Sequence, residues 1–87
     1  MTRNILVTGA ASGIGAAICK KLANEETNFL VHTRSNKQGL DKIVRYIEGA
    51  GGRAHQKLSD LSIKGEGRQL IKEVIQHFDG LDIIIAN

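Results

Sequence analysis

The sequence predicts a doubly wound α/β fold, in which helices cover both faces of a parallel sheet. Two hydrophobic patterns alternate along the 87 residues. Short apolar runs are typical of strands buried on both faces, and longer segments carry one apolar face at helical spacing. The first apolar run also leads directly into a glycine-rich turn. This alternation predicts the order βαβαβαβ within one domain, residues 1–87, with right-handed crossovers.

The strands are predicted from short apolar runs, and the helices from repeats of three and four residues. The predicted strands are 4–8 ("NILVT"), 28–33 ("NFLVHT"), 53–58 ("RAHQKL") and 81–86 ("LDIIIA"). The first helix, 13–24, has Ile14, Ile18 and Leu22 at four-residue spacing. The second, 37–50, places Leu40, Ile43, Val44 and Ile47 on one face, and glycines end it. The third is predicted to begin at an N-cap, Ser62, and to stop at Asp79-Gly80.

Composition excludes several classes of protein. The net charge of +3 comes from basic residues that are spread along the chain, and aromatic residues make up only 3%. A nucleic-acid interface more often gathers its basic residues and interleaves aromatic ones. A small basic nucleic-acid binder is therefore the weakest of the three functions considered for this chain. The single cysteine, Cys19, cannot form an internal disulfide and fits a reducing compartment. No apolar run approaches the roughly 18 residues of a membrane span. We therefore expect a cytoplasmic protein with no membrane partner.

The turn after the first strand has the residues of a phosphate cradle. Gly9 allows a tight turn, Gly13 lets the backbone approach a pyrophosphate, and Gly15 lets the helix pack closely on the sheet. Thr8 and Ser12 add side-chain hydroxyls within the turn. A plain turn with a helix cap is the alternative. The order of strand, turn, helix and second strand favours a nucleotide.

The end of the second strand indicates which nucleotide binds. A site for NAD places an acidic residue there to hold the ribose 2′-hydroxyl, but here Arg34 and Ser35 follow the strand, with no carboxylate until Asp41. Arginine can bind a 2′-phosphate through two hydrogen bonds, so the pair favours NADP. The alternative is a solvated Arg34. His32 either adds charge when protonated or packs at the strand end.

Four motifs in order resemble the short-chain dehydrogenase/reductase family. "TGAASGIG", residues 8–15, is similar to its cofactor motif, and "HTRSN", 32–36, to its NADP-type second strand end. "SDLS", 59–62, resembles the acidic–apolar pair after the third strand. "LDIIIAN", 81–87, resembles the start of its Asn-Asn-Ala-Gly segment, with alanine in place of the first asparagine. The combination looks most like the bacterial 3-oxoacyl-acyl-carrier-protein reductases and their unassigned relatives.

The resemblance implies a Rossmann-type sheet of order 3-2-1-4 and hydride transfer between NADPH and a carbonyl or alcohol. It implies that the turn seats the pyrophosphate, that Arg34 and Ser35 hold the 2′-phosphate, and that two further pairs flank the adenine and the ribose. The predicted cofactor residues are Thr8, Gly9, Ala10, Ala11, Ser12, Gly13, Ile14, Gly15, Arg34, Ser35, Asp60, Leu61, Ala86 and Asn87. The implied substrate is a small-molecule or acyl-carrier-bound carbonyl compound, and the implied full-length state is a homo-oligomer.

No residue of the chain matches the family's catalytic pattern. Its Tyr-x-x-x-Lys pair has no counterpart, because Tyr46 is followed four positions later by Ala50. We expect Tyr46 to pack, partly buried, on the second helix. The three histidines fall in separate elements, so no metal site is predicted.

The apolar run Ile83–Ile85 is typical of a strand in the middle of a sheet, yet little sequence follows it. We therefore expect the chain to be the cofactor-binding part of a longer, single-domain reductase. The second reading is a non-catalytic nucleotide-binding module complete at 87 residues.

Overall fold

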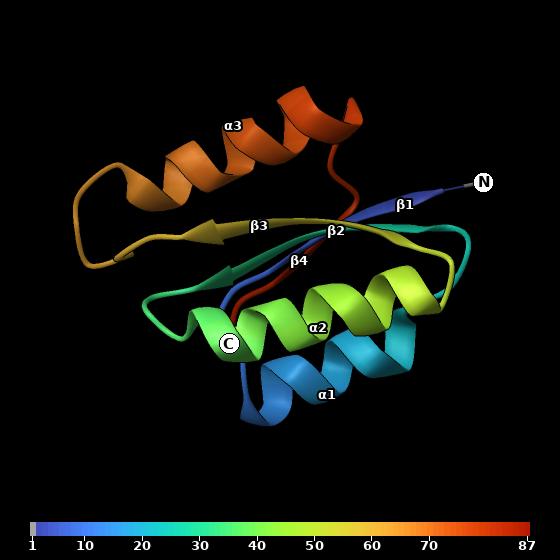
Figure 1. Cartoon of the computed structure of the whole chain (residues 1–87). Helices are drawn as coiled ribbons and strands as arrows, with labels where there is room; N and C mark the ends of the chain where they lie inside the picture. The colour runs from blue at the N-terminus through green and yellow to red at the C-terminus, as the bar shows by residue number, and fades with distance from the viewer. Residues whose placement is uncertain (1) are drawn as a thin grey trace.

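The computed structural model describes residues 2–87 and confirms the predicted α/β architecture. The elements are β1 (Arg3–Val7), α1 (Gly13–Leu22), β2 (Thr27–Thr33), α2 (Lys37–Gly49), β3 (Arg53–Leu58), α3 (Glu66–Phe78) and β4 (Ile83–Ile85). All strand pairs are parallel, and the order across the sheet is β3-β2-β1-β4, as predicted. Helices α1 and α2 cover one face of the sheet and α3 covers the other (Figure 1).

The alternation of side chains along each strand divides the core into two layers. On the side of α1 and α2, Ile5, Val7, Phe29 and Val31 pack with buried residues of both helices. On the opposite side, Leu6 and Leu30 pack against α3. Strand β2 is buried along its whole length, as expected of a central parallel strand. Burying these side chains provides the main stabilisation of so small a domain.

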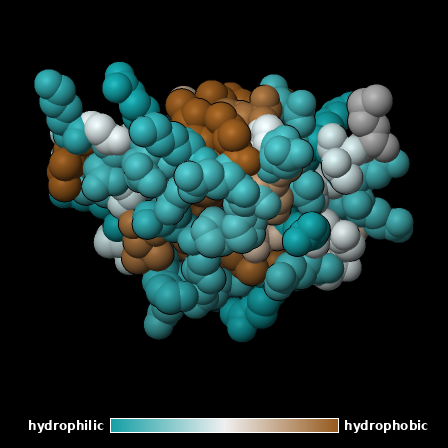
Figure 2. Space-filling view, turned by 90° about the horizontal axis from the view of Figure 1, so that it is seen from above, coloured by the Kyte–Doolittle hydropathy of each residue, from teal (hydrophilic) through white to brown (hydrophobic). Residues whose placement is uncertain are grey.

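The face covered by α3 is only partly closed. Ile84 shares this face with its register partner Leu6, and its side chain is exposed, as is that of Ile75 on the helix. Figure 2 looks down on this side of the molecule and shows apolar atoms gathered among the polar ones. The apolar run of β4 was expected to be a central strand. In the described residues it pairs with β1 alone and forms an edge of the sheet.

The third helix begins later than predicted. It starts at Glu66 after Gly65, whose φ of 91° is left-handed, and Ser62 does not cap it. Instead, the backbone N–H and the hydroxyl of Ser62 both donate to Oδ1 of Asp60, at 2.9 and 2.6 Å. A side-chain turn of this kind competes with helix formation and delays the first helical turn. The ends of α1 and α2 lie one or two residues before the predicted limits.

A buried asparagine joins the start of the sheet to the end of α3. The side-chain amide of Asn4 donates to the carbonyl oxygens of Phe78 and Gly80, and its oxygen accepts from Asn28 at 2.9 Å. The backbone of Asn4 also exchanges hydrogen bonds with Asp82, through the N–H and the carbonyl oxygen. The N–H of Asn4 is taken by a side-chain carboxylate and not by a backbone carbonyl, so β4 begins at Ile83, two residues later than predicted. It also ends one residue earlier than predicted, so it is three residues long and not six.

Candidate functional site

The glycine-rich turn joins β1 to α1 at the carboxyl end of the sheet. Gly9 and Gly13 have φ values of 62° and 58°, which favour glycine strongly over other residues. The N–H of Thr8 donates to the carbonyl oxygen of Ile85 at 3.0 Å. The turn therefore lies between the ends of β1 and β4, where the direction of the strand order changes and where ligands of such sheets bind.

The three glycines of the turn meet three different surroundings. A Cβ at Gly15 would clash with the carbonyl oxygen of Gly9, so α1 can approach the turn only with glycine there. A Cβ at Gly9 would crowd Asn87 at 3.1 Å. A Cβ at Gly13 would meet no atom within 4 Å, so this peptide faces open space. The clash at Gly15 and the crowding at Gly9 fit the close packing and the tight turn expected there, and Gly13 leaves space on its outer side.

The backbone N–H groups of the turn divide into two sets. Those of Gly9 and Ala10 are used internally, because they donate to Nδ1 and to the carbonyl oxygen of His32, at 3.3 and 2.8 Å. Ala10 is also fully buried, so it shapes the turn and offers no exposed contact. The five that follow, from Ala11 to Gly15, have no acceptor within the described part of the chain. They surround the positive end of α1 and are available to an anion.

The side chains of the turn leave its outer surface open. Ser12 occupies the N-cap position in an extended conformation, and its hydroxyl makes no capping bond. Ile14 is 70% exposed, which is unusual for a large apolar side chain directly beside a cluster of free N–H groups. Exposed apolar and polar groups thus lie together at the start of α1, a combination that suits a ligand with both characters.

At the end of β2, Arg34 and Ser35 are exposed. The structure adds a carboxylate that the linear sequence did not reveal. Oδ2 of Asp60 lies 3.4 Å from Nη2 of Arg34, and the arginine side chain remains 77% exposed. The hydrogen bonds from Ser62, and then the charge of Arg34, lower the pKa of Asp60. Arg34 is therefore steered by an ionised partner while its guanidinium still faces solvent.

The two remaining predicted pairs, Asp60 with Leu61 and Ala86 with Asn87, lie at the same edge of the sheet. Leu61, 40% exposed, follows Asp60 and borders a shallow depression formed by residues 61–65 and the start of α3. Asn87 donates from its backbone N–H to Oγ1 of Thr8 at 3.0 Å and from its side chain to the carbonyl oxygen of Gly9 at 3.1 Å. Ala86 is exposed beside it. The fold thus gathers every predicted cofactor segment along the carboxyl ends of the strands.

His32 is the residue whose role sequence reasoning did not resolve. Its side chain is 4% exposed and its two ring nitrogens bridge Gly9 and Ser59. It therefore packs inside the fold at the strand end, which is one of the two alternatives that the sequence left open. The only signal in the sequence was a polar residue within the apolar run of β2.

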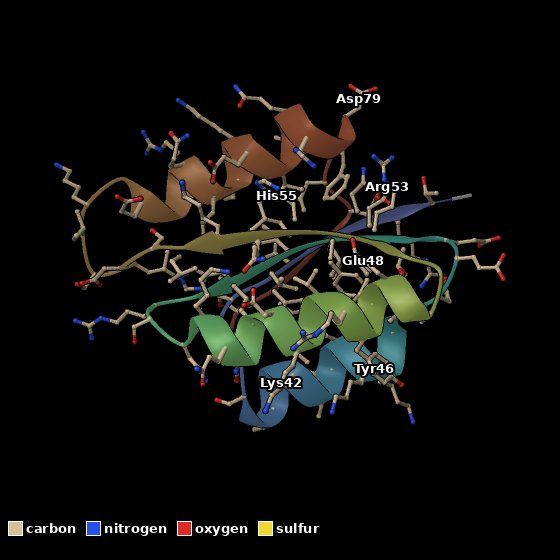
Figure 3. All side chains as sticks on the ribbon, in the orientation of Figure 1. Lys42, Tyr46, Glu48, Arg53, His55 and Asp79 are labelled. Atoms are coloured by element: carbon tan, nitrogen blue, oxygen red, sulfur yellow. The ribbon has the colours of Figure 1, made fainter. Side chains whose placement is uncertain are left out.

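Tyr46 lies away from this edge and is more exposed than expected. It is 47% exposed on the outer side of α2, and the ammonium of Lys20 lies 5.6 Å from the ring centroid (Figure 3). The expectation of a partly buried packing residue was wrong, because this position faces α1 across the helix surface and not the sheet. A cation–π contact of this kind is weak where solvent reaches it.

Two of the three histidines are in contact, although they belong to separate elements. His55 on β3 points toward α3, where it stacks on His77 with ring centroids 4.1 Å apart (Figure 3). Burial, and then the charge of His77, lower the pKa of His55. Across residues 2–87, no group of three or more histidine, cysteine or acidic side chains is arranged to hold a metal ion. None of the helices in that range has the length and apolarity to cross a bilayer.

Comparisons with known proteins agree with the fold and identify the family. The family model described as short chain dehydrogenase matches residues 3–87. An uncharacterized oxidoreductase of Methylorubrum extorquens is 40% identical over 82 residues, 94% of this chain and 33% of that protein. The 3-oxoacyl-[acyl-carrier-protein] reductase FabG of Staphylococcus aureus is 33% identical over 87 residues, 100% of this chain and 35% of that protein. A solved short chain dehydrogenase from Burkholderia cenocepacia, in complex with NADP, matches 94% of this chain and 34% of its own, with 33% identity and a TM-score of 0.88.

The chain therefore belongs to the short-chain dehydrogenase/reductase family. Its relatives are oxidoreductases, and the family binds a nicotinamide dinucleotide. The chain spans about a third of the length of the relatives described here. The predicted family and fold are both confirmed.

Cys19 gives a prediction that is independent of the cofactor. Its side chain is fully buried in the layer beneath α1 and α2, and burial raises the pKa of the thiol to about 11. We expect a thiol reagent at pH 8 to modify the folded protein at least about 100-fold more slowly than the urea-unfolded chain, because only a thiolate reacts.

The same pKa also predicts how stability varies with pH. Between about pH 9 and pH 11 the unfolded thiol ionises while the folded one stays neutral, so unfolding becomes easier as the pH rises. Cys19→Ala removes this contribution and serves as the control in urea melts at each pH. Rapid labelling of the folded protein, or identical pH slopes for the two proteins, would contradict the prediction.

Proposed function

We propose that the chain binds NADP and serves as the cofactor-binding part of a reductase that transfers a hydride between NADPH and a carbonyl compound. The observation that carries this proposal is the row of five unpartnered N–H groups from Ala11 to Gly15 at the start of α1. A Cβ at Gly13 would meet open space, Ile14 is exposed and Asn87 bonds the turn, so this edge has the features of a pyrophosphate seat. The NADP complex of a structural relative supports the choice of cofactor.

The preference for NADP over NAD is assigned to Arg34, with Ser35 beside it. A guanidinium binds a phosphate through charge-assisted hydrogen bonds, and here it is 77% exposed and already directed by Asp60. We assign the adenine to the surface of Asp60 and Leu61, and the ribose near the nicotinamide to Ala86 and Asn87. In this proposal, one extended dinucleotide lies along the strand ends and contacts each of the predicted pairs.

The reaction follows from the cofactor. When bound, NADPH would supply the hydride that reduces a carbonyl compound to an alcohol, and the N–H groups from Ala11 to Gly15, together with Arg34, would hold it. We propose a 3-oxoacyl group carried by acyl carrier protein as the substrate, because the FabG reductase of Staphylococcus aureus matches the entire chain. Tyr46 is not the proton donor in this proposal, since it is on the outer surface of α2. Tyr46→Phe is expected to leave NADP binding unchanged.

Exchange of the charge at Arg34 tests the cofactor assignment. We expect Arg34→Asp to lower the NADP over NAD binding preference by about 10- to 100-fold, because a charged hydrogen bond to the 2′-phosphate contributes about 1.5–3 kcal/mol and a carboxylate repels it. Titration calorimetry with each dinucleotide measures the preference.

Arg45→Asp on α2 provides the matched control. It changes the net charge equally but lies on an exposed helix position away from the strand ends. If both variants shift the preference alike, only long-range charge is at work and Arg34 does not bind the 2′-phosphate. If the unaltered protein binds neither dinucleotide, the proposed function itself is wrong.

A further inference from the structure

The side chain of His32 connects the glycine turn after β1 with the segment after β3. It is the sixth residue of β2 and lies between the turn after β1 and the segment after β3. Nδ1 accepts the N–H of Gly9 at 3.3 Å, and Nε2 lies 2.8 Å from the carbonyl oxygen of Ser59. Its own carbonyl oxygen accepts the N–H of Ala10 at 2.8 Å. A single residue thus binds two successive N–H groups of the turn.

These partners determine the tautomer of His32. A backbone N–H can only donate, so Nδ1 must carry the lone pair that faces Gly9. A carbonyl oxygen can only accept, so the proton must be on Nε2, which donates to Ser59. The neutral Nε2–H form satisfies both bonds at once. The other tautomer would place two donors face to face at Gly9 and two acceptors at Ser59.

The peptide of Gly9 is held from its other side as well. Its carbonyl oxygen accepts the side-chain amide of Asn87 at 3.1 Å and touches the space that a Cβ of Gly15 would need. Gly9 adopts a left-handed φ of 62°, so the chain leaves the extended direction of β1 at this residue. The N–H bond to His32 and the carbonyl bond to Asn87 fix the turn between β2 and β4.

We infer that His32 is a positioning residue for the pyrophosphate seat, acting through Gly9. By holding the N–H groups of Gly9 and Ala10 inward, it keeps the turn in the shape that leaves the following five available to the ligand. Its side chain is 4% exposed, so it does not touch the cofactor. This inference rests on the proposed function and adds a determinant of affinity that lies beneath the site.

Two substitutions separate the bonds that His32 makes. In His32→Asn the side-chain oxygen takes the place of Nδ1 and can still accept from Gly9, but it cannot reach Ser59. In His32→Gln the longer amide can still donate to Ser59 in place of Nε2, but it offers no acceptor at the position of Nδ1. Each variant loses one buried hydrogen bond, so the two are matched in their expected loss of stability. His32→Leu removes both bonds.

NADP titrations at neutral pH distinguish positioning from packing. His32→Asn is expected to bind NADP within about threefold of the unaltered protein, and His32→Gln and His32→Leu about tenfold more weakly. Urea melts are run in parallel. If the Asn and Gln variants lose affinity equally, or if the Leu variant keeps full affinity, His32 has a structural role only and the inference is wrong.

Nuclear magnetic resonance gives a readout that does not depend on the cofactor. The ¹⁵N shifts of the His32 ring are expected to report protonated Nε2 and unprotonated Nδ1, and the Gly9 amide to exchange more slowly with solvent than in His32→Gln. A ring protonated at Nδ1, or unchanged exchange at Gly9, overturns the inference even when NADP binds. Absence of NADP binding with the expected spectra overturns only the proposed function.

Discussion

Gly15→Ala is expected to lower the free energy of unfolding by about 3 kcal/mol and to abolish measurable NADP binding. The new Cβ would enter the space of the Gly9 carbonyl oxygen, a backbone atom that cannot rotate away. Either α1 moves off the sheet or the turn opens, and overpacking of this kind costs about 1–3 kcal/mol. Both movements displace the N–H groups that face the ligand. Urea denaturation and NADP calorimetry on the same preparation measure the two effects.

Gly49→Ala and Gly13→Ala are the controls for this substitution. Gly49 is the last residue of α2 and a Cβ there meets nothing within 4 Å, so alanine is expected to stabilise the protein by about 0.4–1 kcal/mol, because it restricts the unfolded chain. At Gly13 a Cβ also has space, but the φ of 58° costs about 1–2 kcal/mol and the methyl group projects where the ligand is proposed to bind. If the free energies of unfolding of the Gly15→Ala and Gly13→Ala proteins were equal, the proposed clash at Gly15 would be wrong.

Phe29→Ala is expected to have the largest effect on stability, about 3–5 kcal/mol. Phe29 is the largest fully buried side chain, and it lies between Ile5 on β1 and Ala54 on β3 beneath the two helices. The small Ala54 beside it cannot fill the space that it leaves. A domain of this size has a total stability of about 5–15 kcal/mol, so the variant loses a large share of it.

The urea midpoint of Phe29→Ala, compared with that of Phe29→Leu, measures this effect. Leucine keeps most of the apolar volume, and we expect it to cost about 1 kcal/mol. Equal losses for the two variants would show that volume at this position is unimportant. Saturating NADP should raise both midpoints, because a ligand that binds only the folded state stabilises it.

The parts of the fold that follow from hydrophobic periodicity were predictable from the sequence. The buried strand β2 and the one-sided helix α2 have strong patterns, and their limits were correct to within one residue. The start of α3 was not predictable in the same way. Ser62 has the right residue type for an N-cap, but the side chain of Asp60 binds it first, and residue type alone does not rank the two alternatives.

The candidate site was predictable in its segments and not in its internal contacts. Glycine spacing and the basic end of β2 predicted a site at the carboxyl ends of the strands, and the structure places both segments there. The Arg34–Asp60 ion pair joins residues from different strand ends, and the bridge through His32 depends on the orientation of a ring. Contacts of this kind arise only once the strands are ordered side by side, so no local pattern contains them.

The bonds between Asn87 and the turn have a consequence for the order of folding. They join residues 78 and 79 positions apart, and β4 contacts only β1 within the sheet. Contacts so distant along the chain form late, after closure of a long loop. During synthesis, the turn therefore stays incomplete until β4 has left the ribosome, and a nascent chain shorter than this should not retain the dinucleotide. Cofactor capture would then report that β4 has paired with β1.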